Sequence, residues 1–306
     1  MLRSDGAQRK ESLVTNARSV RDVTRAGSLQ VGDLAVPRLG FGTMQLPGPG
    51  SLGPPRDKPA ALAVLRRAVE LGVRFIDTSG YYGPDVANEL ICEALHPYPD
   101  DLLIASKAGV RRADSGFVPA DTPAEIRAQV EHDLQVLHLD TLHLVHARRM
   151  PNSQTPYAET VGALAELRDR GLLRSIGVSN VTVEELRTAQ EVASIASIEN
   201  EYNVADRGSE ELVEVAAQEK LAFVPFHPLA LGALTAGAGK LGEIARERAA
   251  TPVQVALAWL LQRSAAILPI PGTSSTAHLE ENLGAAALAL TTDQVDRLDA
   301  LARSAT

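Results

Sequence analysis

Short apolar runs alternate with helical patterns along most of the chain after residue 28, and this alternation constrains the fold more than any other feature. The apolar runs lie at 39–42, 73–77, 102–106, 142–146, 174–178, 195–199, 221–226 and 266–270. Helical patterns follow them near 58–72, 85–95, 156–170, 208–219 and 276–286, after Asp121-Thr122-Pro123, from Thr182, and in segments that end with 252–263. Strands that alternate with helices in this way indicate a parallel sheet.

Eight strand–helix units over about 260 residues predict an α/β fold of the (β/α)8 type, the TIM barrel, for which about 250 residues is typical. The alternative is a doubly wound sheet, which usually has a GxGxxG turn after its first strand. Residues 40–55 lack that spacing and run into prolines, so we predict one barrel domain over 28–306. Residues 28–36 alternate around Gly32-Asp33 and predict an N-terminal β-hairpin, and 292–303 predict an extra C-terminal helix.

The first 27 residues differ from the rest, with six basic and three acidic residues and no apolar core of a secretory signal. An Arg-rich transit peptide is an alternative, but the acidic residues count against it. We interpret residues 1–27 as a disordered tail.

Composition excludes several classes of protein. No run of about 18 apolar residues occurs, so no membrane-spanning helix is predicted. The only cysteine, Cys92, excludes an intramolecular disulfide framework and a multi-cysteine zinc site. The net charge is −8, and no basic stripe predicts nucleic-acid binding. We expect a cytoplasmic monomer or small homo-oligomer that binds a small molecule, without a metal, a membrane or a nucleic acid as partner.

Polar residues at strand ends mark the expected site, because active sites of such barrels lie at the carboxyl ends of the strands. Asp77 ends one apolar run, Tyr82 follows it in IDTSGYYG, and Lys107 directly follows LLIAS. A neighbouring ammonium lowers the pKa of a phenol from its usual value near 10, and a carboxylate keeps that ammonium charged. Together these three residues can donate a proton to a carbonyl oxygen while hydride reaches the carbonyl carbon.

These residues and their motifs resemble the aldo-keto reductase family over residues 28–303. The motifs are LGFGTMQ (39–45), FIDTSGYYG (75–83), IASK (104–107), IGVSN (176–180), ENEYN (199–203) and IPGTSSTAHLEENL (270–283). Within the family the chain is most similar to the bacterial pyridoxal reductase (pyridoxine 4-dehydrogenase) branch, through QLPGPGSLGPPRD (45–57), HPYPDDL (96–102) and ALAWLLQRS (256–264).

The resemblance implies an oxidoreductase that uses NADPH/NADP+ to reduce an aldehyde or ketone to an alcohol. Pyridoxal, reduced to pyridoxine, is the leading substrate. Tyr82 takes the proton-donor position, and Asp77 and Lys107 take the positions that support it. Two alternatives stay open: a nicotinamide-binding regulatory subunit with little turnover, and a lyase that forms a Schiff base on Lys107.

The resemblance also implies the residues that bind the cofactor. Ser179 and Asn180 correspond to residues that bind the nicotinamide carboxamide, as does Glu199, where many members have glutamine. Phe226 takes the position that stacks on the nicotinamide ring. The segment 271–282 corresponds to the part of the family that binds the 2′-phosphate and the adenine. In this segment His278 stands where relatives often have arginine, and Gly272 stands where some members have a lysine. The complete set is Gly42, Thr43, Met44, Ser179, Asn180, Glu199, Phe226, Pro228, Leu229, Gly272, Thr273, Ser274, Ser275, His278, Glu281 and Asn282.

The fourth catalytic position of the family, usually a histidine, has two candidates in this chain. A gapless alignment of 138–150 places Arg148 there, and His146 lies two residues earlier on the same face of the strand. Either side chain can steer the carbonyl oxygen, His146 as a hydrogen-bond donor and Arg148 as a fixed cation. If His146 acts as a cation, activity should titrate near its ordinary pKa of about 6.5.

Overall fold

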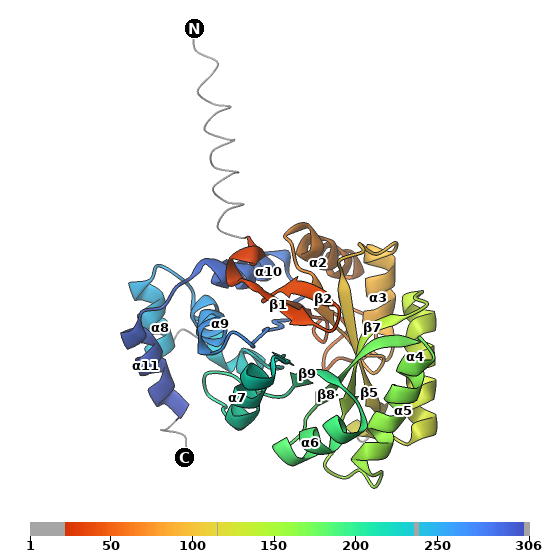
Figure 1. Cartoon of the computed structure of the whole chain (residues 1–306). Helices are drawn as coiled ribbons and strands as arrows, with labels where there is room; N and C mark the ends of the chain where they lie inside the picture. Colours follow the sequence, from red (N-terminus) through yellow and green to blue (C-terminus); the bar gives the residue numbers. More distant parts are fainter. Residues whose placement is uncertain (1–21, 115, 236–238, 303–306) are drawn as a thin grey trace.

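A barrel of parallel strands forms the centre of the computed structural model, which describes residues 22–114, 116–235 and 239–302 (Figure 1). The strand order is β10-β9-β8-β7-β5-β4-β3, and all these neighbours are parallel. The strands are β3 (Phe41–Gly42), β4 (Phe75–Asp77), β5 (Leu103–Ala113), β7 (Leu142–Arg148), β8 (Leu173–Ser179), β9 (Ile195–Glu199) and β10 (Ala222–Phe223).

The eighth apolar run, 266–270, closes the barrel between β10 and β3. The Leu268 N–H donates to the Phe223 carbonyl (2.8 Å), and the Gly40 N–H donates to the Pro269 carbonyl (2.9 Å). This run forms only an isolated bridge, between Phe223 and Ile267, rather than a regular strand. The predicted barrel is therefore confirmed, with its last strand shorter than the apolar pattern suggests.

Helices surround the barrel in the order that the alternation predicts (Figure 1). They are α2 (Lys58–Glu70), α3 (Val86–Leu95), α4 (Pro123–Leu137), α5 (Tyr157–Asp169), α6 (Val183–Val192), α7 (Glu210–Glu219), α8 (Gly239–Glu247), α9 (Pro252–Arg263), α10 (Thr276–Leu283) and α11 (Thr292–Ala302). Two helices begin where the sequence predicts, at Thr122 and Thr182, and each begins with a capping box. In this motif the side chains of the threonine and of a glutamate three residues later accept hydrogen bonds from each other's backbone N–H groups. None of the helices in the described ranges is long and apolar enough to cross a bilayer.

The predicted hairpin, β1 (Ser28–Val31) and β2 (Leu34–Pro37), closes the amino end of the barrel. Val31 and Val36 pack against residues at the starts of strands, among them Phe75 and Leu103. Gly32 makes the turn with a positive φ of 60°, a conformation that glycine adopts without strain. Because side chains fill this end, a ligand is expected at the carboxyl end of the barrel.

Two elements differ from the sequence prediction. β5 continues past Lys107 to Ala113, and its last residues pair antiparallel with β6 (Gly116–Ala120). The two segments form a β-ribbon that extends past the carboxyl end of the parallel sheet. This extension carries Arg111 and Arg112 and has no continuous apolar pattern that would reveal it. The predicted tail over 1–27 ends too late, since Val23–Ala26 forms a short 3-10 helix (η1) with Val23 buried in the core. The rest of that tail, residues 1–21, lies outside the described residues.

Candidate active site

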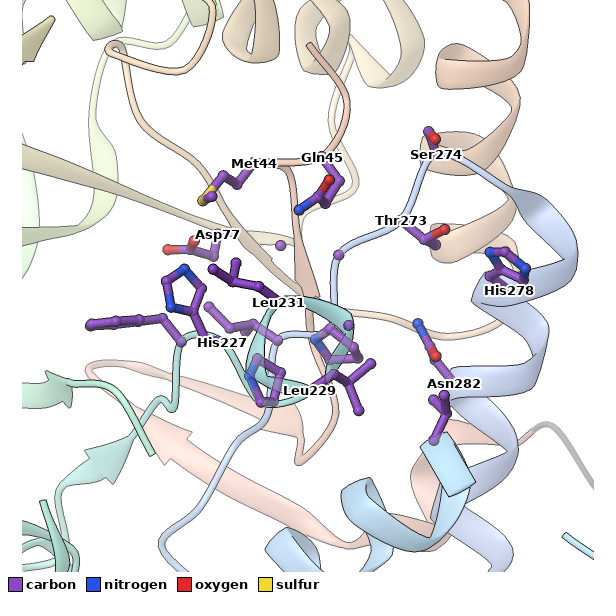
Figure 2. Close-up of a pocket in the computed structure, with 18 of the residues that line it drawn as sticks. Met44, Gln45, Asp77, His227, Leu229, Leu231, Thr273, Ser274, His278 and Asn282 are labelled. Atoms are coloured by element: carbon purple, nitrogen blue, oxygen red, sulfur yellow. The ribbon is translucent and has the colours of Figure 1, made fainter. Parts of the chain in front are cut away.

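A cavity of about 560 Å³ opens at the carboxyl end of the barrel, within the size range of small-molecule sites. Figure 2 shows Asp77 at one end of it, and Thr273, His278 and Asn282 at the other, beside α10. The cavity therefore connects the strand ends with the start of a helix. The predicted residues that line it are Gly42, Met44, Asp77, Tyr82, Phe226, Pro228, Leu229, Gly272, Thr273, Ser274, His278, Glu281 and Asn282.

Asp77 and Lys107 form a buried ion pair beneath the cavity. The register of β4 and β5 pairs Asp77 with Ala105, which places Lys107 two residues further along the same face. The Lys107 Nζ lies 2.5 Å from Asp77 Oδ1 and donates to the Thr78 carbonyl at 3.2 Å. Only 2% of Lys107 is exposed. The structure thus brings these two predicted residues into direct contact.

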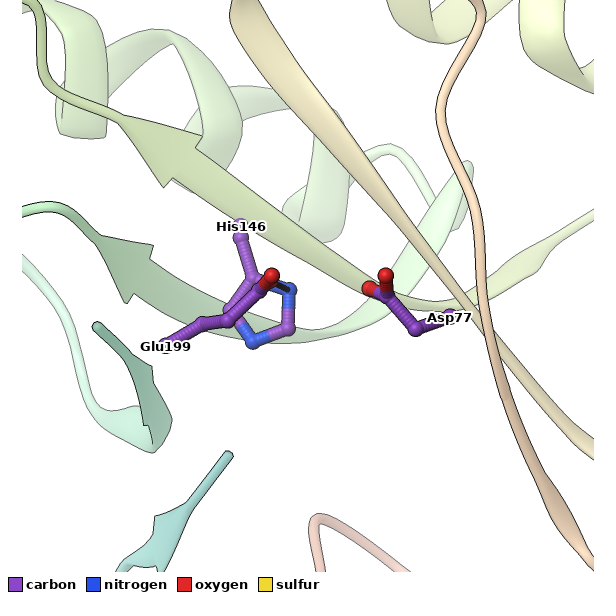
Figure 3. Close-up of side chains that lie close together, drawn as sticks. All are labelled: Asp77, His146 and Glu199. Carbon is purple, nitrogen blue, oxygen red and sulfur yellow. Dashed lines mark ion pairs between the residues drawn. The ribbon is translucent and has the colours of Figure 1, made fainter. Parts of the chain in front are cut away.

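Glu199 is a second carboxylate that contacts Lys107, and this contact was not predicted. Glu199 Oε1 lies 3.3 Å from Lys107 Nζ. Figure 3 shows Glu199 beside His146, where Oε2 lies 3.2 Å from His146 Nδ1. Burial alone would lower the pKa of Lys107, but Asp77 and Glu199 outweigh it and raise that pKa well above its usual value. Lys107 is therefore held as a cation between two carboxylates.

The ligand atoms of Asp77, His146 and Glu199 lie within 4.8 Å of one another, close enough in principle for a metal ion. The ammonium of Lys107 already contacts both carboxylates. The side chain of Lys107 therefore already supplies a cation at this cluster.

His146 is fully buried in the barrel wall below the cavity. Its Nε2 lies 2.9 Å from Ser197 Oγ, across β8. Burial, followed by the charge of Lys107, lowers the pKa of His146 to about 3. The imidazole is therefore neutral at physiological pH.

Tyr82 lies in the cavity wall, with the Lys107 ammonium 5.2 Å from the centroid of its ring. No group in the described part of the chain forms a hydrogen bond with its hydroxyl. Burial raises the pKa of Tyr82 well above 10, although Lys107 opposes that shift. The sequence-based expectation of a lowered pKa is therefore wrong for this structure, because the depth of the site outweighs the ammonium. Tyr82 keeps its proton until a partner accepts it.

Arg148 ends β7 one layer above His146. Its Nη1 donates to Ser179 Oγ (3.3 Å), and its guanidinium carbon lies 5.4 Å from the centroid of the Phe226 ring, which lines the cavity. Of the two candidates for the fourth catalytic position, Arg148 is the one that lies beside the cavity.

The far end of the cavity is the first turn of α10. Ser275 caps this helix by accepting from the His278 N–H (3.4 Å), and Thr273 Oγ1 accepts from the Ser275 N–H (3.1 Å). Helix N-termini attract anions through their free N–H groups. A β-carbon on Gly272 would lie 2.6 Å from the Gly42 carbonyl oxygen, so this close approach of two backbone segments requires glycine.

Comparison with known proteins settles the family, since the profile described as "Aldo/keto reductase family" matches residues 38–303. The chain belongs to the aldo/keto reductase family. It is 45% identical over 284 residues to pyridoxine 4-dehydrogenase of Escherichia coli (strain K12), and the matched region covers 91% of this chain and 99% of that protein. An uncharacterized oxidoreductase of Schizosaccharomyces pombe is 37% identical, covering 93% of each protein. The crystal structure of an aldo/keto reductase from Klebsiella pneumoniae with NADP and acetate superimposes with a TM-score of 0.77 at 27% identity, covering 90% of this chain and 94% of that one.

Several residues that the resemblance assigns to the cofactor do not line the cavity of this aldo/keto reductase: Thr43, Ser179, Asn180, Glu199 and Ser275. Thr43 is buried and donates to the Asp77 carbonyl (3.0 Å), which ties β3 to β4. Asn180 donates to the Arg149 carbonyl (3.1 Å). Further residues line the cavity without having been predicted: Gln45, His227, Leu231, Gly232, Pro252, Val253 and Ile270. Of these, Gln45 and Ile270 lie in motifs that signalled the site, LGFGTMQ and IPGTSSTAHLEENL.

We expect kcat/KM of this aldo/keto reductase to show no titration step from His146 between about pH 5 and 9. The imidazole, with a pKa of about 3, stays neutral across that range. The measurement is a pH profile with one aldehyde for the wild type and His146→Asn, and the profiles should have the same shape. His132→Asn, which alters an exposed histidine paired with Asp85, is the matched control. A step near pH 6.5 that disappears only in His146→Asn would establish the cationic role instead.

Proposed function

We propose that this chain is an NADP(H)-dependent carbonyl reductase that converts an aldehyde to an alcohol, with pyridoxal, reduced to pyridoxine, as the leading substrate. The observation that carries the proposal is Lys107, held between Asp77 and Glu199 directly beneath Tyr82 in the cavity wall. The identity with an enzyme named pyridoxine 4-dehydrogenase supports the choice of substrate.

The residues present fit a dinucleotide, because one continuous cavity joins Tyr82 and Phe226 to the start of α10. At the reaction end Gly42, Met44, Phe226, Pro228 and Leu229 would hold the nicotinamide, with Ser179, Asn180 and Glu199 around them. At the α10 end Thr273, Ser274, Ser275 and His278 would hold the 2′-phosphate, with Gly272, Glu281 and Asn282 near the adenine. When bound, the reduced nicotinamide supplies the hydride for the carbonyl carbon.

The chain's own residues handle the proton. The Tyr82 hydroxyl donates a hydrogen bond to the carbonyl oxygen and then transfers its proton to it. Lys107 stabilises the phenolate that remains, because its ammonium lies 5.2 Å from the centroid of the Tyr82 ring and is kept charged by Asp77 and Glu199. Arg148 stays charged at every working pH and contributes a fixed positive field at the mouth of the site.

The test is an aldehyde panel, including pyridoxal, with NADPH and with NADH as reductant, followed by loss of reduced-nicotinamide absorbance. We expect turnover with NADPH and with pyridoxal among the accepted aldehydes. If NADPH binds and no aldehyde or ketone is reduced, the regulatory-subunit alternative holds and the proposed function fails.

NADPH should bind more tightly than NADH, because hydroxyls and free N–H groups at the start of α10 can receive the 2′-phosphate. His278→Arg should tighten NADPH binding by about 10-fold, the usual strength of a charged hydrogen bond. Quenching of protein emission by added cofactor gives both affinities. NADH is the control and should bind His278→Arg and the wild type equally. Equal affinity of the wild type for both cofactors would refute the 2′-phosphate assignment.

A further inference from the structure

Arg148 carries a positive charge that no acidic side chain in the described part of the chain neutralises by contact. Of its five N–H donors, one is used, in the hydrogen bond to Ser179 Oγ, and no carboxylate of the described residues lies within ion-pairing distance. Its neighbour Arg149 is different, since it pairs with Glu185 at 3.0 Å and donates to the Thr155 carbonyl at 3.0 Å. Asp77 and Glu199 both contact Lys107 instead.

A half-buried guanidinium with unused N–H donors lowers the stability of the fold unless a partner accepts hydrogen bonds from those donors. Arg148 lies beside the cavity at the end where the carbonyl group reacts, since its guanidinium is next to Phe226. A ligand of that cavity is therefore in position to supply the missing anion.

The residues that pack around Tyr82, which lines this end of the cavity, are apolar and aromatic. Tyr81 and Tyr82 form a small cluster with Met44 and Met150 packed against it. The Phe117 ring, on β6, lies 5.4 Å from the Tyr81 ring in an edge-to-face arrangement and is 41% exposed. Such walls favour a flat aromatic molecule, which gains both apolar burial and ring contacts.

We propose that Arg148 selects aromatic aldehydes that carry an anionic oxygen next to the carbonyl group. This inference rests on the proposed function, because it requires the carbonyl oxygen to face Tyr82. A phenolate or carboxylate oxygen on the adjacent ring carbon then faces the planar fork of Arg148, which binds such oxygens through two N–H groups. Arg148 thus binds the substrate rather than transferring a proton.

The test compares three aldehydes above the pKa of the phenols. 2-Hydroxybenzaldehyde carries its anionic oxygen next to the carbonyl group, and 2-methoxybenzaldehyde has an uncharged oxygen at the same position. 4-Hydroxybenzaldehyde carries its anionic oxygen on the opposite side of the ring. The wild type should prefer the first over both others in kcat/KM. Arg148→Met should reduce the ratio of kcat/KM for 2-hydroxybenzaldehyde to kcat/KM for 2-methoxybenzaldehyde by about 10–100-fold, as expected for a lost charged hydrogen bond. Most of this change should lie in KM. Arg148→Lys, which keeps the charge and loses the fork, should retain part of that ratio.

Arg112→Met is the matched control, because the Arg112 guanidinium lies over the Phe117 ring at the rim, and the ratio should not change. Quenching by NADPH shows that each variant is folded. An equal loss for all three aldehydes in Arg148→Met would mean that Arg148 polarises the carbonyl oxygen itself, and it would overturn the inference alone. An unchanged ratio would also overturn it. Failure of the wild type to reduce any aldehyde would overturn the proposed function and the inference together.

Discussion

Tyr82→Phe should lower kcat for aldehyde reduction at least about 100-fold, the usual contribution of a positioned general acid. The phenol is the group in the cavity wall that keeps its proton at neutral pH and has Lys107 close by to stabilise the phenolate. Affinity for NADPH should change little, because Tyr82 lies over Lys107 at the strand ends rather than at the start of α10. Steady-state kinetics and cofactor quenching measure the two effects separately.

The matched control is Tyr81→Phe. The Tyr81 ring packs edge-to-face on the Tyr82 ring (5.1 Å between centroids) and is buried to a similar extent. A general loss of packing would therefore affect both variants alike, whereas loss of the proton donor affects Tyr82→Phe alone. Full activity of Tyr82→Phe with loss in Tyr81→Phe would transfer the role to Tyr81.

The sequence was sufficient to predict that Asp77 and Lys107 meet. Asp77 ends one apolar run and Lys107 follows the next, and both runs predict strands. Consecutive strands of a barrel are neighbours whose carboxyl ends face the same side. The structure places them on β4 and β5, which pair directly. This kind of contact depends only on strand order and alternation, and both are visible in the sequence.

The contact of Glu199 with Lys107 could not be predicted in this way. β9 is separated from β5 by β7 and β8, so the approach depends on the curvature of the closed barrel and on what lies between. Gly177 on β8 leaves the space in which His146 and Ser197 meet across that strand: a β-carbon there would lie 2.3 Å from His146 Cδ2 and 2.5 Å from Ser197 Oγ. A glycine inside a strand often marks such a close approach, so Gly177 in IGVSN signals a crowded barrel interior but not the Glu199–Lys107 contact.

Burial is the second property that the sequence does not reveal. The chemistry of a phenol beside an ammonium predicts a lowered pKa for Tyr82, yet the depth of the site raises it. His146 likewise looks like a titratable donor at a strand end, whereas its fully buried position keeps it neutral. In both cases the residue type and position were predicted, and the protonation state depended on how deeply the barrel encloses the side chain.

Lys107→Met should abolish most turnover and also destabilise the fold by about 3–5 kcal/mol at neutral pH, the usual cost of breaking a buried ion pair. The substitution fills the volume but leaves Asp77 and Glu199 without their cation in a buried site. Lys58→Met is the matched control, because Lys58 forms an exposed ion pair with Glu93 (2.6 Å). Exposed pairs contribute about 0–1 kcal/mol, so this control should lose little stability and no activity.

The destabilisation of Lys107→Met should increase with pH. Burial and the charge of Glu199 already raise the pKa of Asp77 from 3.8 to about 7, and Lys107 is the main group that opposes them. Without Lys107 that pKa rises further. An acid with a higher pKa in the folded state than in the unfolded state stabilises the fold at low pH, and this contribution is lost as the pH rises through the folded-state pKa. Urea unfolding at about pH 5 and about pH 8 should therefore show the larger loss at the higher pH.

A second substitution separates the charge from the packing. Asp77→Asn added to Lys107→Met removes one of the two unpaired carboxylates, so it should recover part of the lost stability at about pH 8 and reduce its pH dependence. It should recover no turnover, because the phenolate of Tyr82 would still lack its ammonium. If Lys107→Met were equally destabilised at both pH values and Asp77→Asn restored nothing, the loss would come from packing, and the buried carboxylates would already be protonated in the wild type. Lys107 would then not be the group that keeps this cluster charged.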